Sequence, residues 1–583
     1  MKLRYISTIA ALALSAAGAF SQDLKQEITV EHEVVPERHD VRRLSFTPTV
    51  NLPRHSSKPL DYSSRTVNIK VPGTISELDP AAWADTIYTA PWRGYANIGL
   101  MPLFNADLSA GYKFIDNDRT RFAGFLQYNG AVYRGKYPEG NDENRWFRNH
   151  TATVDLVLHQ TVGKRSSVDA GADFSLARYN MPGTDGSLVP QIMRRAGLQA
   201  HFSSSAKQID YSAGFKYSHF AYNNTIVTDR PDRAAYRPVH ENLFGLDGYM
   251  RCFFDELSSV GVDADFNIVA NNRRSVTAFS TVPGSHAYAD APGSYNHGLL
   301  TFRPYYRFDY KNFRLNLGAR VDFTFNSGKV FHIAPDVLVS WRPSWIVAFF
   351  AKAGGGEHQN TLSSLYGVTP YAQTMMAYGN SHIPLTVDAG VTLGSWRGLY
   401  LEGGIGYARA NDWLMPVTDM TDCLTVFTPI DMRGFHWRVE AGYKYRDYGS
   451  LSLSYEGTQQ GYDRGYYLWR DRAKTVLGAH LNLTPVRRLD IAVDYELRSG
   501  RRMWDSGISM APSGEGGALI PTSWTSVSDL GRVSSLGVGV TYALTDQLSA
   551  FIYGNNLLNN RHSLIGLVPA QGINGLLGVA MKF

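Results

Sequence analysis

Apolar and polar side chains alternate along most of the chain, from about Gly94 to the C-terminus. The clearest run is Phe313–Phe325, where every second residue is leucine, alanine, valine or phenylalanine and most residues between them are charged or polar. Successive side chains of a β-strand point to opposite faces, so this run predicts a strand with one apolar and one polar face. Leu489–Leu497 repeats the pattern. We therefore expect an all-β fold.

Strand length and link length distinguish a membrane barrel from a soluble antiparallel sheet, which would also alternate. Many of the runs last about ten to fifteen residues, whereas a globular strand has about five or six and a tilted membrane strand needs about 9–11. Short links alternate with long links, which lie near 135–145, 180–189, 222–240, 270–296, 355–382, 411–432, 457–474, 499–531 and 555–573. Short periplasmic turns and longer outside loops are typical of outer-membrane barrels.

The count of alternating runs predicts 22 strands. Their expected starts are near 94, 104, 121, 146, 167, 190, 208, 241, 259, 296, 313, 329, 345, 383, 399, 432, 449, 475, 488, 532, 547 and 574. An even count places both ends of the barrel on the periplasmic side. The predicted fold class is a transmembrane antiparallel β-barrel whose outer face contacts outer-membrane lipid.

Composition excludes several other classes of protein. Apolar residues make up 44% of the 583 residues and aromatic residues 13%, which is too much for a disordered chain. After the first twenty residues no apolar run reaches the ~18 residues that a membrane helix needs. The 2 cysteines exclude a disulfide scaffold. A net charge of +5 does not indicate nucleic acid as a partner.

The N-terminus reads as a secretory signal peptide. Lys2 and Arg4 precede the apolar stretch Ile6–Ala19, and cleavage after Ala19 or Ser21 fits the small residues there. The alternative is an apolar N-terminal helix of the mature fold. The predicted organisation is a signal peptide at 1–21, a short extended N-terminal segment at 22–93, periplasmic or lumenal, and the barrel at 94–583.

The C-terminal part resembles the TonB-dependent receptors of bacterial outer membranes. Tyr553–His562 reads Tyr-Gly-Asn-Asn-Leu-Leu-Asn-Asn-Arg-His and is similar to the signature of their penultimate strand. The final run alternates and ends in an aromatic residue (Val579, Met581, Phe583), which resembles the signal read by the barrel-assembly machinery. The resemblance implies a 22-strand barrel in the outer membrane that takes up scarce solutes, with TonB as an energy-coupling partner.

The N-terminal segment departs from that family. About 72 residues separate Gln22 from Arg93, fewer than a receptor plug takes, and seven prolines favour extended chain. The layout resembles plug-lacking receptor-like barrels of Bacteroides-type bacteria, with Phe46–Thr49 as the Pro-Thr-containing part. Gln26–Val30 resembles a TonB box; the alternative is an ordinary β-branched strand. TonB or other envelope proteins are therefore both open as partners.

Charged residues on the polar faces are candidates for orienting a solute in the lumen. The expected acidic wall lies on the fourth to ninth strands (Asp155, Asp169, Asp173, Asp210, Asp263, Asp265), and the basic wall on the tenth and eleventh (Arg303, Arg307, Arg314, Arg320). Opposed walls of this kind would orient a polar solute. The alternative is that these charges pair across neighbouring strands or hold the N-terminal segment.

Aromatic residues in two long links are candidates for binding a ligand or a protein partner. Four lie in the first link (Tyr462, Tyr466, Tyr467, Trp469) and two in the next (Trp504, Trp524). Tyrosine and tryptophan present large amphipathic surfaces. The alternative is that they pack the links into a lid or join the interfacial aromatic girdle.

The sequence contains no motif for catalysis, and the 16 histidines show no metal-ligand spacing. We therefore expect no enzyme activity, no cofactor and no metal site. Three functions stay open: a solute transporter, a non-transporting barrel subunit of an outer-membrane complex, and, with nothing in its favour, an outer-membrane enzyme.

Overall fold

A computed structural model represents the chain. It describes residues 92–101, 105–136, 143–182, 188–223, 239–272, 296–372, 378–419, 424–446, 448–461, 473–512, 519–564 and 568–583. The expected signal peptide, the TonB-box-like stretch and Phe46–Thr49 lie outside these residues. Apart from Trp92, these residues belong to the compact unit that contains Arg93–Phe583.

The described residues form 24 strands and one short helix, α3, at Leu362–Val368. The strands are β1 (Gly94–Met101), β2 (Asn105–Asp116), β3 (Thr120–Lys136), β4 (Asn144–Val162), β5 (Ser166–Pro182), β6 (Leu188–Ser205), β7 (Ile209–Tyr222), β8 (Val239–Phe253), β9 (Ser258–Asn271), β10 (His297–Tyr310), β11 (Phe313–Phe325), β12 (Phe331–Trp341), β13 (Val347–His358), β14 (Ser381–Trp396), β15 (Leu399–Asp419), β16 (Leu424–Tyr445), β17 (Gly449–Gly461), β18 (Thr475–Val486), β19 (Leu489–Ser499), β20 (Arg502–Pro512), β21 (Leu519–Asp529), β22 (Val533–Ala543), β23 (Leu548–Asn555) and β24 (Asn574–Lys582).

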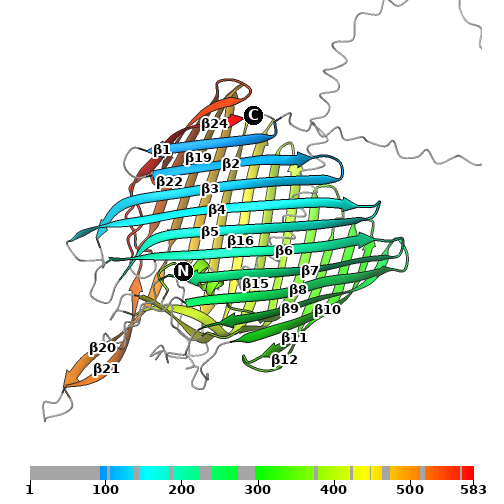
Figure 1. The fold of residues 1–583 in the computed structure, drawn as a ribbon, viewed down its shortest axis with the longest axis horizontal. Helices are drawn as coiled ribbons and strands as arrows, with labels where there is room; N and C mark the ends of the chain where they lie inside the picture. Colours follow the sequence, from blue (N-terminus) through cyan, green and yellow to red (C-terminus); the bar gives the residue numbers. More distant parts are fainter. Residues whose placement is uncertain are drawn as a thin grey trace, which may run out of the picture. The chain divides into compact units, whose positions relative to one another are not determined.

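Twenty-two of these strands form a closed antiparallel wall. Consecutive strands pair from β1 to β19, β19 then pairs with β22, and β24 pairs with β1 (Figure 1). The strands β20 and β21 pair with each other as a hairpin that leaves the wall (Figure 1). Closure removes the sheet edges, whose unpaired backbone groups would be costly in a bilayer. The predicted strand number and barrel class are confirmed.

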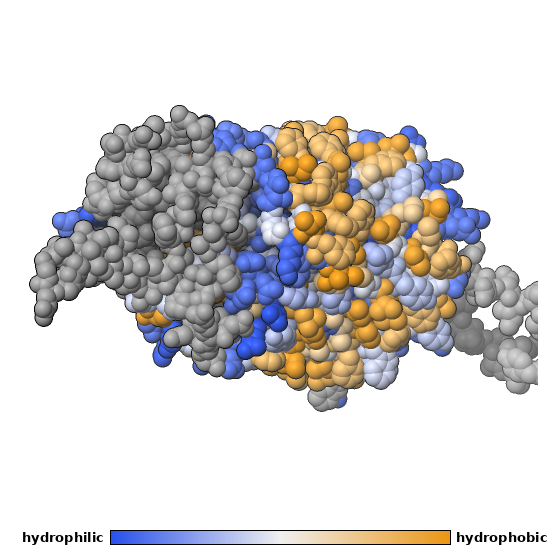
Figure 2. Space-filling view, turned by 90° about the horizontal axis from the view of Figure 1, so that it is seen from below, coloured by the Kyte–Doolittle hydropathy of each residue, from blue (hydrophilic) through white to orange (hydrophobic). Residues whose placement is uncertain are grey.

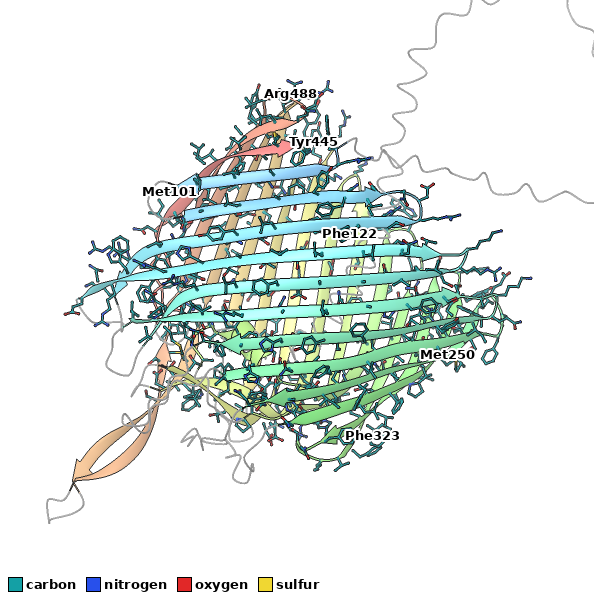
Figure 3. The ribbon with its side chains drawn as sticks, in the orientation of Figure 1. Met101, Phe122, Met250, Phe323, Tyr445 and Arg488 are labelled. Carbon is teal, nitrogen blue, oxygen red and sulfur yellow. The ribbon has the colours of Figure 1, made fainter. Side chains whose placement is uncertain are left out.

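The outer face of the wall is apolar. Alternate residues of the strands expose large apolar side chains, among them Phe174 at 47%, Leu246 at 60% and Ile405 at 69%. Figure 2 shows hydrophobic residues gathered over the middle of the wall, with hydrophilic residues on both sides of this zone. Met250, labelled in Figure 3, is one of the outward-facing residues and is 50% exposed. An apolar exterior on a closed wall is the arrangement by which strands cross a bilayer.

In the part of the chain that the structure describes, none of the helices has the length and apolar character needed to cross a membrane.

Three of the expected long links contain regular structure. The link expected near 411–432 is mostly the ends of β15 and β16, which continue to Asp419 and resume at Leu424. The link near 499–531 holds the β20–β21 hairpin, and the link near 355–382 holds α3. Alternation does not mark β15 here because Trp413, Leu414 and Met415 are all 0% exposed. With both faces covered, the pattern loses its period of two.

Candidate functional site in the barrel lumen

The predicted charges lie on the lumen face of the wall. Asp155 stands opposite Asp173 in the register of β4 and β5, while their sequence neighbours Leu156 and Phe174 are exposed on the outer face. Asp263 stands opposite Arg303 in the register of β9 and β10. The remaining members follow the same alternation: Asp169, Asp210, Asp265, Arg307, Arg314 and Arg320.

Several of these charges make ion pairs with other residues of the wall. Asp173 Oδ2 lies 3.2 Å from Arg195, and Asp265 Oδ2 lies 3.6 Å from Lys216. On the basic side, Arg307 and Arg314 both contact Asp309, at 2.6 and 2.8 Å. Such pairs reduce the local charge, so the acidic and basic walls differ less in net charge than the sequence alone indicates.

A further group of charges, which the sequence reasoning missed, lines the lumen on β14 to β17. Arg438 contacts Glu440 at 2.7 Å and Glu456 at 3.4 Å. The Tyr400 hydroxyl donates to Glu440 Oε1 at 2.9 Å. On β14, the buried Asp388 contacts His436 Nε2 at 2.8 Å. The same parity argument could have found these residues, because all of them alternate with exposed outward residues such as Ile405 and Val439.

At the end of the barrel that carries the long links, the lumen face becomes apolar. Lumen-facing residues of β5 and β7 are almost completely buried, including Tyr179 at 1%, Phe220 at 2% and Tyr222 at 1%. They pack with Leu362 and Leu365 from the link between β13 and β14 in a single apolar cluster. We call residues 359–372 and 378–380, which contain α3, the lumen segment. It begins at β13 and reaches lumen-facing side chains of β5, β7 and β8.

Local sequence makes α3 possible and tertiary contacts hold it. Thr361 caps its N-terminus in a capping box with Ser364. At 7 residues the helix is too short to be stable alone. The buried carboxylate of Glu241 on β8 accepts from the backbone N–H of Leu362 at 2.9 and 3.0 Å and from the hydroxyl of Tyr378.

The aromatic part of the lumen segment is packed on several strands. Tyr366 lies 5.7 Å from Phe220 and 6.0 Å from Tyr179, measured between ring centroids. The carbonyl of Tyr371 accepts from the N–H of Thr425 on β16 at 3.1 Å. Burial raises the pKa of the Tyr371 phenol far above its ordinary value, so this ring is a neutral packing group.

The predicted loop aromatics divide into two groups. Tyr462, Tyr466, Tyr467 and Trp469 lie outside the described residues. Trp504 lies on β20, is 5% exposed and packs with Met415, Val417 and Ile430. Its ring therefore joins the base of the β20–β21 hairpin to β15 and β16.

A buried carboxylate on β11 connects three strands near the lumen segment. Asp322 accepts from the guanidinium of Arg320 at 3.0 Å, from the hydroxyl of Thr301 at 2.5 Å and from the backbone N–H of Glu357 at 2.7 Å. Its side chain is 1% exposed. Three donors are needed here because a buried carboxylate is costly without them.

Substituting Asp322→Ala should therefore destabilise the barrel. Arg320 would lose its carboxylate partner, and breaking a buried pair in this way costs about 3–5 kcal/mol. The temperature at which the purified barrel loses its compact, heat-modifiable form on a gel should fall clearly. Asp494→Ala is the matched control, because Asp494 is 62% exposed and pairs only with His480 among the described contacts. Equal unfolding temperatures for the two variants would contradict the prediction.

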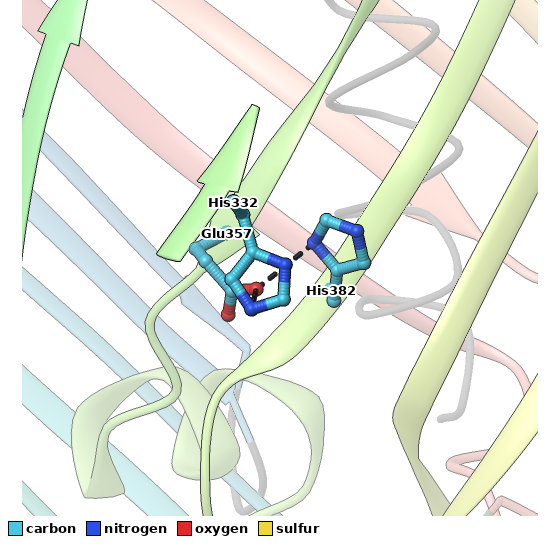
Figure 4. A group of neighbouring side chains, drawn as sticks. All are labelled: His332, Glu357 and His382. Carbon is cyan, nitrogen blue, oxygen red and sulfur yellow. Dashed lines mark ion pairs between the residues drawn. The ribbon is translucent and has the colours of Figure 1, made fainter. Parts of the chain in front are cut away.

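Three potential metal ligands meet beside this carboxylate, although the sequence predicted no metal site. His332 on β12, Glu357 on β13 and His382 on β14 point toward one another (Figure 4). Their positions are 25 residues apart in sequence at each step, a spacing that matches no motif. Only the strand register brings them together.

Comparisons with known proteins identify the fold. No family model matches the chain, and no curated protein matches its sequence. The solved structures that it resembles include a mutant of the ferric enterobactin receptor of Pseudomonas aeruginosa, with 11% identity, a TM-score of 0.59 and coverage of 84% of this chain and 79% of the other. The siderophore receptor PirA of Acinetobacter baumannii is 10% identical with a TM-score of 0.60, and the match covers 84% of this chain and 80% of the other. The outer membrane transporter YddB of Escherichia coli is 9% identical with a TM-score of 0.57, and the match covers 84% of this chain and 80% of the other. The resemblance to receptor barrels is thus confirmed at the level of the fold.

Proposed function

We propose that the chain is an outer-membrane barrel of bacteria that takes up a solute through its lumen, as TonB-dependent receptors do. The observation that carries this proposal is a closed 22-strand wall with an apolar exterior and a charged lumen face. The solved structures with this fold are named as siderophore receptors and as an outer membrane transporter. Such a lumen can bind and orient a polar solute with the lumen charges of β4–β11 and of β14–β17.

Features of the wall support two of the proposed partners. The exposed apolar belt fits the hydrocarbon of the outer-membrane lipid. Val579, Met581 and Phe583 are 46%, 44% and 47% exposed on the outer face at the seam of the barrel. That position suits recognition by the barrel-assembly machinery while the barrel is still open.

The N-terminal residues 22–93 are proposed to replace the plug of a receptor, and Gln26–Val30 to bind TonB. A cysteine placed at Thr29 should then form a disulfide cross-link with a cysteine in the receptor-binding strand of TonB in intact cells. A cysteine at Ser63, in the same segment, is the control position. Equal cross-linking at both positions would argue against a TonB box.

A second function is favoured by the β20–β21 hairpin, which projects away from the wall (Figure 1). A projecting hairpin can add contacts to a partner protein. The chain could then be a non-transporting subunit of a multi-protein outer-membrane complex.

Purification from native membranes distinguishes these two functions. For a stand-alone transporter, the chain should be recovered from mild detergent by itself or with TonB. A subunit of a complex should instead be recovered with discrete partner proteins at fixed stoichiometry. Replacing residues 502–529 by a short turn should then remove these partners.

A further inference from the structure

His332, Glu357 and His382 lie on three adjacent strands at the end of the lumen that holds the lumen segment. Glu357 and His382 stand opposite each other in the register of β13 and β14. His332 stands opposite Asp322 in the register of β11 and β12. A register shift between Gly354 and Gly356 turns Glu357 toward the two histidines. Glu357 and His382 also flank the lumen segment at its two ends.

The ligand atoms are spaced as a small metal ion requires. His332 Nε2 lies 3.1 Å and His382 Nδ1 lies 2.9 Å from the same oxygen, Glu357 Oε1 (Figure 4). One ligand atom from each residue lies within 4.8 Å of the other two. Around a tetrahedral ion with bonds of about 2.0–2.1 Å, ligand atoms are separated by roughly 3.4 Å. The two nitrogen–oxygen distances therefore lie within about half an ångström of the separation that such an ion requires.

The hydrogen bonding of the cluster is incomplete. Glu357 Oε1 and His382 Nδ1 approach each other, but both are buried atoms that form no hydrogen bond with any residue that the structure describes. The Glu357 side chain is 4% exposed. A buried carboxylate oxygen without a donor is costly, and a cation at this point would remove that cost. The ring centroids of His332 and His382 are 4.0 Å apart, so both imidazoles lie close enough to share one ion. Neutral imidazole is the form that binds metal.

The surroundings hold the ligands in place. The N–H of Glu357 donates to Asp322 Oδ2 at 2.7 Å. The side chains of His332 and His382 are 11% and 18% exposed, so both rings are partly accessible.

We propose that His332, Glu357 and His382 bind one divalent transition-metal ion, with a further coordination position open to the lumen. Two imidazoles and one carboxylate suit Zn²⁺ and its first-row neighbours rather than Ca²⁺ or Mg²⁺, which take oxygen ligands. The bound ion joins both ends of the lumen segment to β12 and so fastens it at its base. This inference does not rest on solute uptake, because it concerns binding to the folded barrel.

The test uses the full chain, purified in detergent and freed of metal with a chelator. Titration with Zn²⁺ should show about one site per chain with a dissociation constant in the micromolar range or below, and Co²⁺ should give visible absorption bands of low-symmetry coordination. Replacing Glu357→Gln or His382→Gln should weaken Zn²⁺ binding by roughly ten- to a hundred-fold or more and remove the Co²⁺ bands. The control is His480→Gln: His480 is another lumen histidine, 2.6 Å from Asp494.

Folding of each variant is checked separately by its heat-modifiable gel mobility, which should match that of the unmodified chain. Binding that survives both ligand substitutions in folded protein would overturn the proposal. The absence of Zn²⁺ binding by the unmodified chain at tens of micromolar would overturn it as well. Loss of binding in the ligand variants alone, with the His480→Gln chain unaffected, would establish the site.

Discussion

Deleting Phe583 should remove most of the assembled barrel from the outer membrane. The seam between β1 and β24 is short, with six paired positions from Tyr95–Lys582 to Leu100–Leu577. Phe583 extends it: its N–H donates to Gly94 O at 2.9 Å, and its carbonyl accepts from Gly94 N–H at 2.8 Å. Its ring stacks on Tyr112, with the ring centroids 6.2 Å apart.

Two effects of this deletion add together. The two backbone hydrogen bonds contribute about 2 kcal/mol at the β1–β24 seam, which corresponds to roughly thirty-fold in an equilibrium. The deletion also removes the terminal aromatic residue that resembles the assembly signal. We therefore expect at least about a ten-fold loss of heat-modifiable barrel in membranes from cells at low expression.

Point substitutions separate these effects. Phe583→Ala keeps the backbone hydrogen bonds to Gly94 and loses only the ring. If the hydrogen bonds of the seam are the larger effect, this substitution should reduce assembly less than the deletion does. If recognition of the aromatic ring by the assembly machinery is the larger effect, both variants should reduce assembly equally. Lys582→Ala is the control, because the Lys582 backbone and its pairing with Tyr95 stay in place. Normal amounts of barrel after deletion of Phe583 would contradict both contributions.

The wall could be predicted from sequence because lipid imposes the pattern. The expected starts at 313 and 399 coincide with those of β11 and β15, since one face of each strand must be apolar within the bilayer. Beyond the bilayer that constraint ends. The outer parts of β15 and β16, with Trp413 and Phe427 buried among other strands, carry no alternation and were expected to be loop.

The lumen was predictable only in part. Parity placed Asp155 and Arg320 on the lumen face, but it could not show that Arg320 pairs with Asp322 two residues away. The metal-ligand cluster depends on the register shift at Gly354–Gly356, which alternation does not reveal. The lumen segment escaped notice because α3 is stabilised by contacts with β5, β7 and β8 rather than by its own 7 residues.

Substituting Leu365→Asp should release the lumen segment from the wall. Leu365 is 0% exposed and lies at the centre of the apolar cluster with Leu362, Tyr179 and Phe220. Truncating a buried leucine costs about 2–5 kcal/mol, and a charged carboxylate in its place costs more. If the substitution destabilises the packed form of the segment by about 3 kcal/mol, the open form becomes more than a hundred-fold more populated. The wall itself should stay folded, because α3 contributes no strand to it.

Chymotrypsin applied to intact cells measures this opening. Cleavage follows the population of the open form when closing is faster than cutting, so the segment should be cut about a hundred-fold faster in Leu365→Asp than in the unmodified chain. Mass spectrometry of the fragments places the cut within 359–380. Ser363→Asp is the matched control: Ser363 is half-buried in the first turn of α3, where an acidic residue is tolerated.

The comparison between these two variants decides what holds the segment. If Leu365→Asp and Ser363→Asp are cut at the same slow rate, the apolar contacts are not the main restraint, and the hydrogen bonds of Glu241 to Leu362 and Tyr378 carry the segment instead. Glu241→Gln, which weakens those bonds and leaves the apolar cluster intact, would then give the faster cleavage. If only Leu365→Asp is cut quickly, the segment is a packed part of the lumen face. Its release should then also admit larger polar solutes at the outer end of the barrel.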